Sequence, residues 1–106
     1  MFVIDRVNMS TEYNIVINIA SWQGMREIGR FFIGADGDFA NDIFAKLKGD
    51  STSKDVALIR IDLEKKEDDN TPARLKSICC SLNQYIENCR IMTLDIFMFF
   101  TLHDGH

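Results

Sequence analysis

An acidic segment at residues 36–42, Asp-Gly-Asp-Phe-Ala-Asn-Asp, is the part of the chain that comes closest to a metal-binding motif. A calcium loop needs oxygen ligands at regular positions, a glycine for the sharp turn and a bidentate acid at its end. In a loop that starts at Asp36, Ala40 stands at a ligand position, Asn41 at the glycine position and Leu47 at the position of the final acid. These departures argue against calcium. Acids in the first turn of a helix, where the dipole favours negative charge, explain the same residues.

The cysteines and histidines are the only soft ligands for a tetrahedral zinc site. Cys79, Cys80 and Cys89 lack the Cys-x-x-Cys spacing, and His103 and His106 both fall in the last four residues. On a helix, Cys79 and Cys89 would share an apolar face and pack as small hydrophobic residues, while Cys80 would point to solvent. We therefore predict no metal and no cofactor. An odd number of cysteines, two of them adjacent, predicts reduced thiols.

Few groups are available for acid–base or phosphate chemistry. The segment 34–37, Gly-Ala-Asp-Gly, precedes a predicted helix as a phosphate loop would, but it lacks the lysine of such loops and carries acids that repel an anion. Asp62 and Glu64 share the solvent face of a predicted strand, where carboxylates ordinarily serve solubility. We predict no catalytic residue and regard an enzyme as the less favoured class.

The composition is that of one globular domain, with 46% hydrophobic and 26% charged residues. A net charge of -4 opposes the phosphate neutralisation that drives nucleic-acid binding, so nucleic acid is not a predicted partner. The first residues lack a basic region followed by a long apolar run, which predicts no signal peptide and a cytoplasmic protein. We expect an N-terminal extension at residues 1–11, either disordered or a short strand, and a single domain at residues 12–106.

Alternation of apolar and polar residues predicts three strands, at residues 13–20, 26–33 and 56–63. The turn residues between the first two strands favour a hairpin. Asp36 or Asp38 is expected to cap a helix that runs to about residue 48 and lies between the second and third strands.

Thr71 and Pro72 predict a further helix, because a capping hydroxyl followed by proline is typical of a helix start. This helix is expected to end near Asn88, and Thr93 is expected to begin another. The predicted fold is α+β, a two-layer sandwich in the order β-β-α-β-α-α, with a small mixed sheet of three or four strands, helices on one face, and parallel second and third strands. The apolar stripe of the helix after Pro72 comprises Leu75, Ile78, Cys79, Leu82, Ile86 and Cys89.

Residues 91–102 hold nine apolar side chains in twelve positions. The segment is shorter than the ~20 apolar residues that span a bilayer, so no membrane is predicted. Residues 96–102 also alternate as a strand would, but a helix that is apolar on all sides needs two neighbours. One neighbour is the fold itself, and the other is a second copy, a different protein or a hydrophobic ligand. The predicted interface residues are Trp22, which lies in the hairpin turn, and Phe97, Phe99, Phe100 and Leu102.

Four segments carry a resemblance to a known group of sequences: residues 32–36, Phe-Ile-Gly-Ala-Asp; residues 48–49, Lys-Gly; residues 80–83, Cys-Ser-Leu-Asn; and residues 87–93, Glu-Asn-Cys-Arg-Ile-Met-Thr. With them, residues 12 to 102 resemble an uncharacterised family of short bacterial proteins of unknown function. The resemblance implies a bacterial, single-domain protein, and it implies no activity and no catalytic residue.

Excess apolar surface without catalytic groups predicts a small cytoplasmic protein-interaction module. The expected partner is a second copy, which makes a homodimer, or another protein. The alternative is a small-molecule-binding protein or weak enzyme with an apolar pocket between the sheet and the helices.

Overall fold

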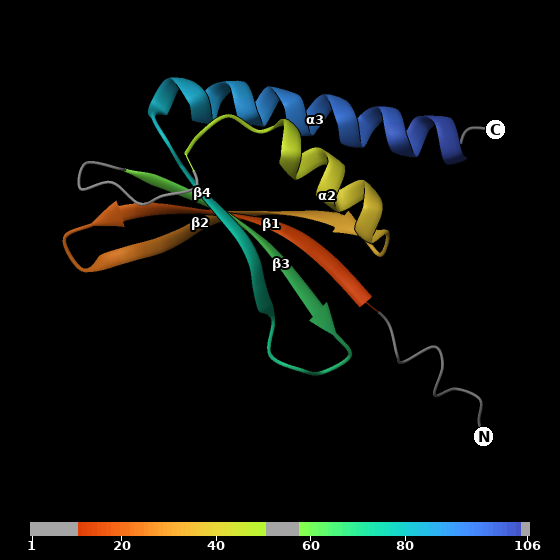
Figure 1. Ribbon diagram of the computed structural model, residues 1–106, viewed down its shortest axis with the longest axis horizontal. Coiled ribbons are helices and arrows are strands. Elements are labelled where there is room, and N and C mark those ends of the chain that lie inside the picture. Colours follow the sequence, from red (N-terminus) through yellow and green to blue (C-terminus); the bar gives the residue numbers. More distant parts are fainter. Residues whose placement is uncertain (1–10, 51–57, 105–106) are drawn as a thin grey trace.

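A computed structural model describes residues 11–50 and 58–104, and over these residues the chain forms a four-stranded sheet with two helices on one face (Figure 1). This arrangement confirms the predicted α+β fold. Residues 1–10, which make up nearly all of the predicted extension, lie outside the described residues. The elements in chain order are β1 (Thr11–Ser21), β2 (Gly24–Gly34), α2 (Gly37–Lys46), β3 (Ile59–Glu67), β4 (Ala73–Cys80) and α3 (Leu82–Asp104).

The strands lie in the order β2-β1-β3-β4, and each neighbouring pair is antiparallel. β2 and β3 therefore run in the same direction, as predicted, but they are not neighbours because β1 lies between them. The sheet is antiparallel throughout, so the prediction of a mixed sheet was wrong. β1 takes the central place because both of its faces are buried, with Ile15 and Ile17 on one face and Val16 on the other.

Residues 73–80 form a strand, where the spacing after Pro72 predicted a helix. The polypeptide turns back at Asp68, whose φ of 54° lies in the left-handed region that aspartate tolerates better than most residues. The amide of Asn70 then donates to the carbonyl of Glu67 at 2.9 Å. Pairing with β3 places Ile78 opposite Ile61 and decides the structure, because the ladder satisfies the backbone, and Ile78 packs against the core that contains the buried Ile61.

The last helix, α3, is continuous from Leu82 to Asp104, where two helices were expected. It begins with a capping box: Ser81 Oγ accepts from the Gln84 amide at 3.2 Å, and Gln84 Oε1 accepts from the Ser81 amide at 2.9 Å. No glycine or proline occurs between Leu82 and Asp104, so nothing in the sequence interrupts the helix near Asn88 or Thr93.

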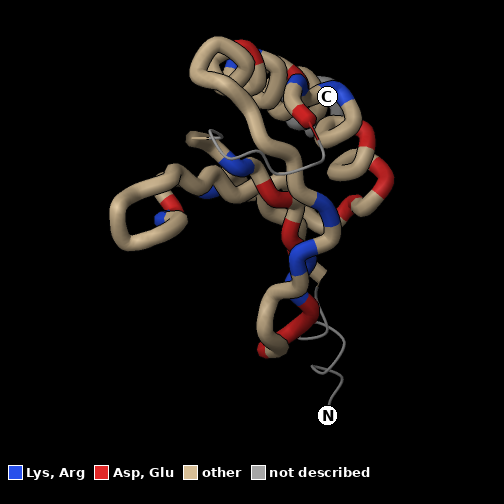
Figure 2. The backbone as a smooth tube through the Cα atoms, turned by 60° about the vertical axis from the view of Figure 1, so that its left-hand side comes forward, with Lys and Arg blue, Asp and Glu red and all other residues tan. Residues whose placement is uncertain are grey.

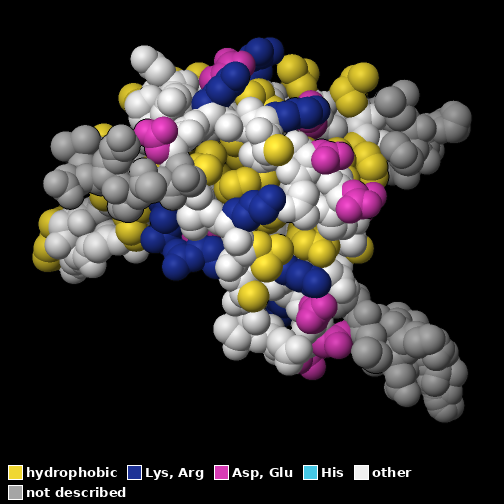
Figure 3. Space-filling view, in the orientation of Figure 1, with side chains coloured by type: hydrophobic (Ala, Val, Ile, Leu, Met, Phe, Trp, Pro, Cys, Tyr) yellow, Lys and Arg dark blue, Asp and Glu magenta, His cyan; other side chains and the backbone are white. Residues whose placement is uncertain are grey.

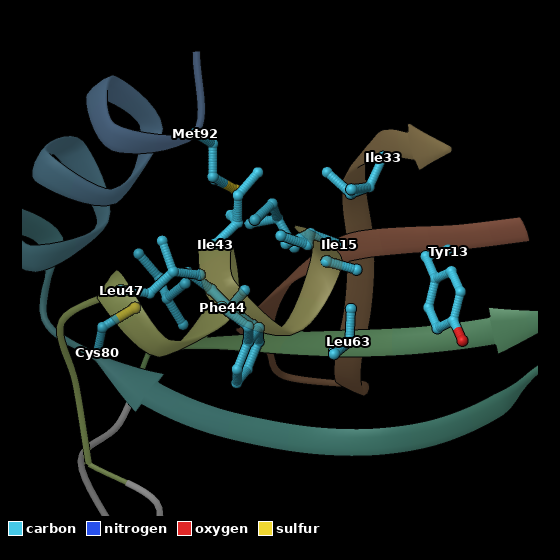
Figure 4. Close-up of a cluster of buried hydrophobic side chains, with 13 residues drawn as sticks. Tyr13, Ile15, Ile33, Ile43, Phe44, Leu47, Leu63, Cys80 and Met92 are labelled. Atoms are coloured by element: carbon cyan, nitrogen blue, oxygen red, sulfur yellow. The ribbon is translucent and has the colours of Figure 1, made fainter. Parts of the chain in front are cut away.

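The core lies between the sheet and the two helices (Figure 4). Every strand and both helices contribute to it, so the core joins the two layers. α2 enters the core with its apolar face after Asp36, whose carboxylate accepts from the Phe39 amide at 3.1 Å and caps the helix as predicted. The buried cluster comprises Tyr13, Ile15, Ile17, Ile33, Ala40, Ile43, Phe44, Leu47, Ile59, Ile61, Leu63, Cys80 and Met92.

Candidate interaction surface

The candidate metal ligands that the structure describes do not form a metal site. Asp36 caps α2 and Asp38 lies in its first turn, as dipole stabilisation predicts. Within residues 11–50 and 58–104, no three histidine, cysteine, aspartate or glutamate side chains come together as a metal site requires. The His106 position lies outside the described residues, and the side chain of His103 is likewise not described.

The cysteines are free thiols, and Cys89 packs against the core as predicted, but the exposure of Cys79 and Cys80 is the reverse of the prediction. Cys80 is only 4% exposed and lies in the core, whereas Cys79 is partly exposed on the opposite face of β4. The prediction placed both on a helix, and in a strand adjacent residues point to opposite faces. Burial raises the pKa of the Cys80 thiol to about 11, so this thiol is protonated near neutral pH and is a poor nucleophile.

Asp62, predicted to be a solvent-facing carboxylate, is 3% exposed on the sheet face away from the helices. It accepts hydrogen bonds from Asn18 Nδ2 at 3.0 Å, Arg60 Nε at 3.0 Å and Ser77 Oγ at 2.6 Å. The charged residues of β3 and β4 follow one another along this hairpin (Figure 2). With its lone pairs occupied by neighbouring strands, Asp62 cross-links β1, β3 and β4 and offers little capacity to a ligand.

Polar and aromatic contacts fix the inner face of α3, which is the side turned toward α2 and the sheet. Lys46 Nζ lies 2.6 Å from Asp95 Oδ2, which joins α2 to α3. The rings of Phe39 and Phe99 stack with 3.9 Å between their centroids. Met92, which precedes both Asp95 and Phe99 on α3, is fully buried in the core. The rotation of α3 about its own axis is therefore determined by the inner face.

Asn88 makes the most specific contact of this inner face. Its side-chain amide donates from Nδ2 to the Lys48 carbonyl at 2.9 Å, and its Oδ1 accepts from the Lys48 amide at 2.7 Å. One fully buried side chain thus satisfies both backbone groups of a residue in the segment that follows α2. Gly49 comes next, and a Cβ there would lie 2.7 Å from the Cys79 carbonyl oxygen, so only glycine fits this close approach.

The side of α3 opposite the inner face is apolar and exposed, and we call it the outer face. Two charged residues, Arg90 and Glu87, lie among the apolar residues of this face and form an ion pair, with 3.0 Å between Arg90 Nη2 and Glu87 Oε2. Figure 3 shows hydrophobic side chains alternating with charged ones along the upper edge of the molecule, where α3 runs. Between 48% and 62% of each apolar side chain of the outer face is exposed, and these side chains are Leu82, Ile86, Leu94, Phe97 and Met98.

The predicted interface residues lie in different surroundings. Phe97 is on the outer face and is 62% exposed, whereas Phe99 is partly buried in its stack with Phe39. The side chains of Phe100 and Leu102 lie outside the described part of the chain. Trp22 is 91% exposed in the β1–β2 turn, at the opposite end of the molecule from the C-terminal end of α3 (Figure 1).

Sequence reasoning missed Leu82 and Ile86 as surface residues. It placed both in the buried stripe of a helix that began at Pro72, and that helix is a strand over residues 73–80. The capping box at Ser81 was the available signal, because it sets the start of α3 and hence the phase of its faces.

β2 presents a second apolar surface at one edge of the sheet. Met25, Ile28 and Phe32 are exposed there, and no described segment pairs with the outer side of this strand. Register shifts interrupt β2 in two places, opposite Tyr13/Asn14 and Ile17/Asn18 of β1. Such bulges bend an edge strand and hinder pairing with another strand. The continuous outer face of α3 is therefore the better candidate for an interface.

The chain matches no family model, no curated protein and no solved structure. Over the described residues, no helix is both long and apolar enough to cross a bilayer.

Proposed function

We propose that this protein is a small protein-interaction module that self-associates through the outer face of α3. One observation carries the proposal: five large apolar side chains are exposed on one side of a helix whose other side is already fixed against the core. Scattered apolar residues are normal on a protein surface, but neighbouring ones on one helix face are typical of an interface.

A second copy is the partner that this surface suits. A helix with apolar residues on two sides reaches its lowest free energy when both sides are covered, and the fold covers only the inner face. The ion pair of Arg90 with Glu87 gives the outer face a balanced charge, which does not repel an identical surface. Homodimers commonly join through the same patch on both subunits.

Light scattering on a sizing column, over a wide range of protein concentration, tests the proposal. We expect the wild type to reach twice 12.2 kDa. Phe97→Asp should weaken self-association, because it places a charge in the apolar contact. Leu58→Asp is the matched control: Leu58 is similarly exposed but precedes the buried Ile59, so it points to the sheet face away from the helices.

A wild type that stays monomeric at every concentration would refute self-association. Equal weakening by Phe97→Asp and Leu58→Asp would refute the role of α3. Trp22→Asp tests the remaining predicted interface residue that the structure describes. Trp22 lies in the β1–β2 turn and not on α3, so we expect no change of mass.

The cytoplasmic location, the bacterial origin and the small-molecule alternative stay predictions. The alternative places an apolar pocket between the sheet and the helices, and the core side chains lie in this space. No observation among the described residues favours the small-molecule alternative over self-association.

A further inference from the structure

The outer face of α3 has a regular spacing that bears on how two copies would meet. Leu82, Ile86, Arg90, Leu94 and Met98 follow one another at every fourth position. Side chains four residues apart form a continuous ridge on a helix surface. All five residues of this ridge are exposed. The ridge therefore provides a continuous surface for another helix.

The ridge is also symmetric about its central residue. Positions equally distant from Arg90 are both apolar: Ile86 matches Leu94, and Leu82 matches Met98. When two identical helices meet in opposite directions about a two-fold axis, residues equally distant from the axis face each other. An axis beside Arg90 therefore places apolar side chains opposite apolar side chains along the whole ridge.

The charges of the outer face fit the same axis. Arg90 Nη2 lies 3.0 Å from Glu87 Oε2 of its own helix, one turn away. With the axis beside Arg90, Glu87 of the partner subunit lies one helical turn from the axis, within reach of the long arginine side chain. Each guanidinium can then bridge two carboxylates, and the two arginines at the axis are neutralised by two glutamates. A charged residue inside an apolar contact also defines the register, because a shifted alignment would leave it unpaired.

We infer that α3 pairs with α3 of a second copy in antiparallel orientation, about a two-fold axis beside Arg90, with Arg90 of each copy bound to Glu87 of the partner subunit. This inference rests on the self-association proposed above. Packing of one such ridge against the other corresponds to helices that cross at about 50°. In this arrangement Phe97 lies near the partner's Asn83, beside Met98 of the ridge and inside the contact.

Exchange of the two charges tests the pairing. Glu87→Arg and Arg90→Glu each place four like charges around the axis, so each variant alone should dimerise about tenfold or more weakly than the wild type. An equimolar mixture of the two should form a heterodimer, seen by native mass spectrometry. The double variant Glu87→Arg/Arg90→Glu should recover the homodimer, because it restores the charge balance. Unchanged melting temperatures would show that each variant folds.

The direction of the helices is tested at the two ends of the ridge. In an antiparallel pair, Leu82→Glu/Met98→Lys brings opposite charges together, whereas Leu82→Glu/Met98→Glu brings like charges together. We expect the first variant to remain a dimer and the second to become a monomer. Equal behaviour of both variants would overturn the antiparallel arrangement.

The outcomes separate this inference from the proposed function. A dimeric wild type that Phe97→Asp dissociates supports self-association through α3. If in that case the mixture of Glu87→Arg and Arg90→Glu forms no heterodimer, only the arrangement about Arg90 is refuted. A monomeric wild type refutes both.

Discussion

At the scale of single residues, the Cys80 thiol shows how packing changes chemistry. Cys80 is a free cysteine at the end of β4, and its position there buries the thiol in the core. Desolvation is the largest cause of its raised pKa, and Asn88 acts in the opposite direction through a hydrogen bond. Cys80 therefore acts as a buried core residue, and its thiol loses its proton only at alkaline pH.

This titration predicts a loss of stability at alkaline pH. Burial raises the pKa of the thiol from 9.0 to about 11, so above pH 9 the unfolded chain releases a proton that the folded chain keeps. The contribution of Cys80 to stability is complete below pH 9 and is lost as the pH rises toward 11, by about 2 kcal/mol.

Urea unfolding of the wild type and of Cys80→Ala, at pH 8 and at pH 11, measures this effect. Other groups titrate in the same range, and the comparison with Cys80→Ala removes their contribution. The difference in unfolding free energy between the two proteins should shrink as the pH rises. A difference that does not change with pH would contradict the assignment to Cys80.

At the scale of elements, the position of α3 depends on its connection to the segment after α2. Asn88 pairs with both backbone groups of Lys48, and the neighbouring Asp50 exchanges two hydrogen bonds with Cys79 of β4. The segment 48–50 is thus held from α3 on one side and from the sheet on the other. These hydrogen bonds hold α3 against the segment 48–50, and this contact sets the side of α3 that faces outward.

Asn88→Leu should remove that connection at nearly constant volume. The amide and carbonyl of Lys48 would lose their partners, and the expected cost is about 3 kcal/mol of unfolding free energy. Asn83→Leu, at an exposed position of the same helix, should change the stability of the monomer, measured at low protein concentration, by about 0.5 kcal/mol or less. Urea denaturation compares the two variants, and equal effects would show that the contacts of Asn88 are not important.

The elements also differ in how well the sequence predicts them. The β1–β2 hairpin, the cap of α2 at Asp36 and the strand that contains Ile61 follow from local patterns, because alternation and capping are local properties. β4 does not, because Thr71 and Pro72 form a good helix start and only pairing with β3 makes residues 73–80 a strand. Local preference gave way to tertiary pairing there.

The same error determined how much of the candidate surface could be predicted. Phe97 was identified from the apolar excess of the last segment, and it is exposed. Leu82 and Ile86 were assigned to a buried stripe, since a helix that begins at the wrong residue has its faces in the wrong phase. The ion pair between Arg90 and Glu87 could not be predicted from the sequence, because it depends on where α3 begins and on which of its faces is exposed.

At the scale of the whole molecule, the sheet consists of two hairpins, β1–β2 and β3–β4, that meet where β1 pairs with β3. Each hairpin forms between neighbouring parts of the chain. The pairing of β1 with β3 instead joins distant residues, such as Ile19 with Ile59 and Thr11 with Glu67. Asp62 lies in this seam, where it binds Asn18 of one hairpin and Ser77 of the other.

The seam between the hairpins has a consequence for folding speed. Contacts between distant residues require the intervening chain to be closed into a loop before they stabilise anything, and proteins rich in such contacts fold in milliseconds to seconds. We expect stopped-flow circular dichroism to follow refolding on that time scale, with the union of β1 and β3 as the slow step. Refolding that is complete within microseconds would contradict this expectation. If two copies associate through α3, association should follow the pairing of β1 with β3, because α3 is oriented by its contacts with the complete core.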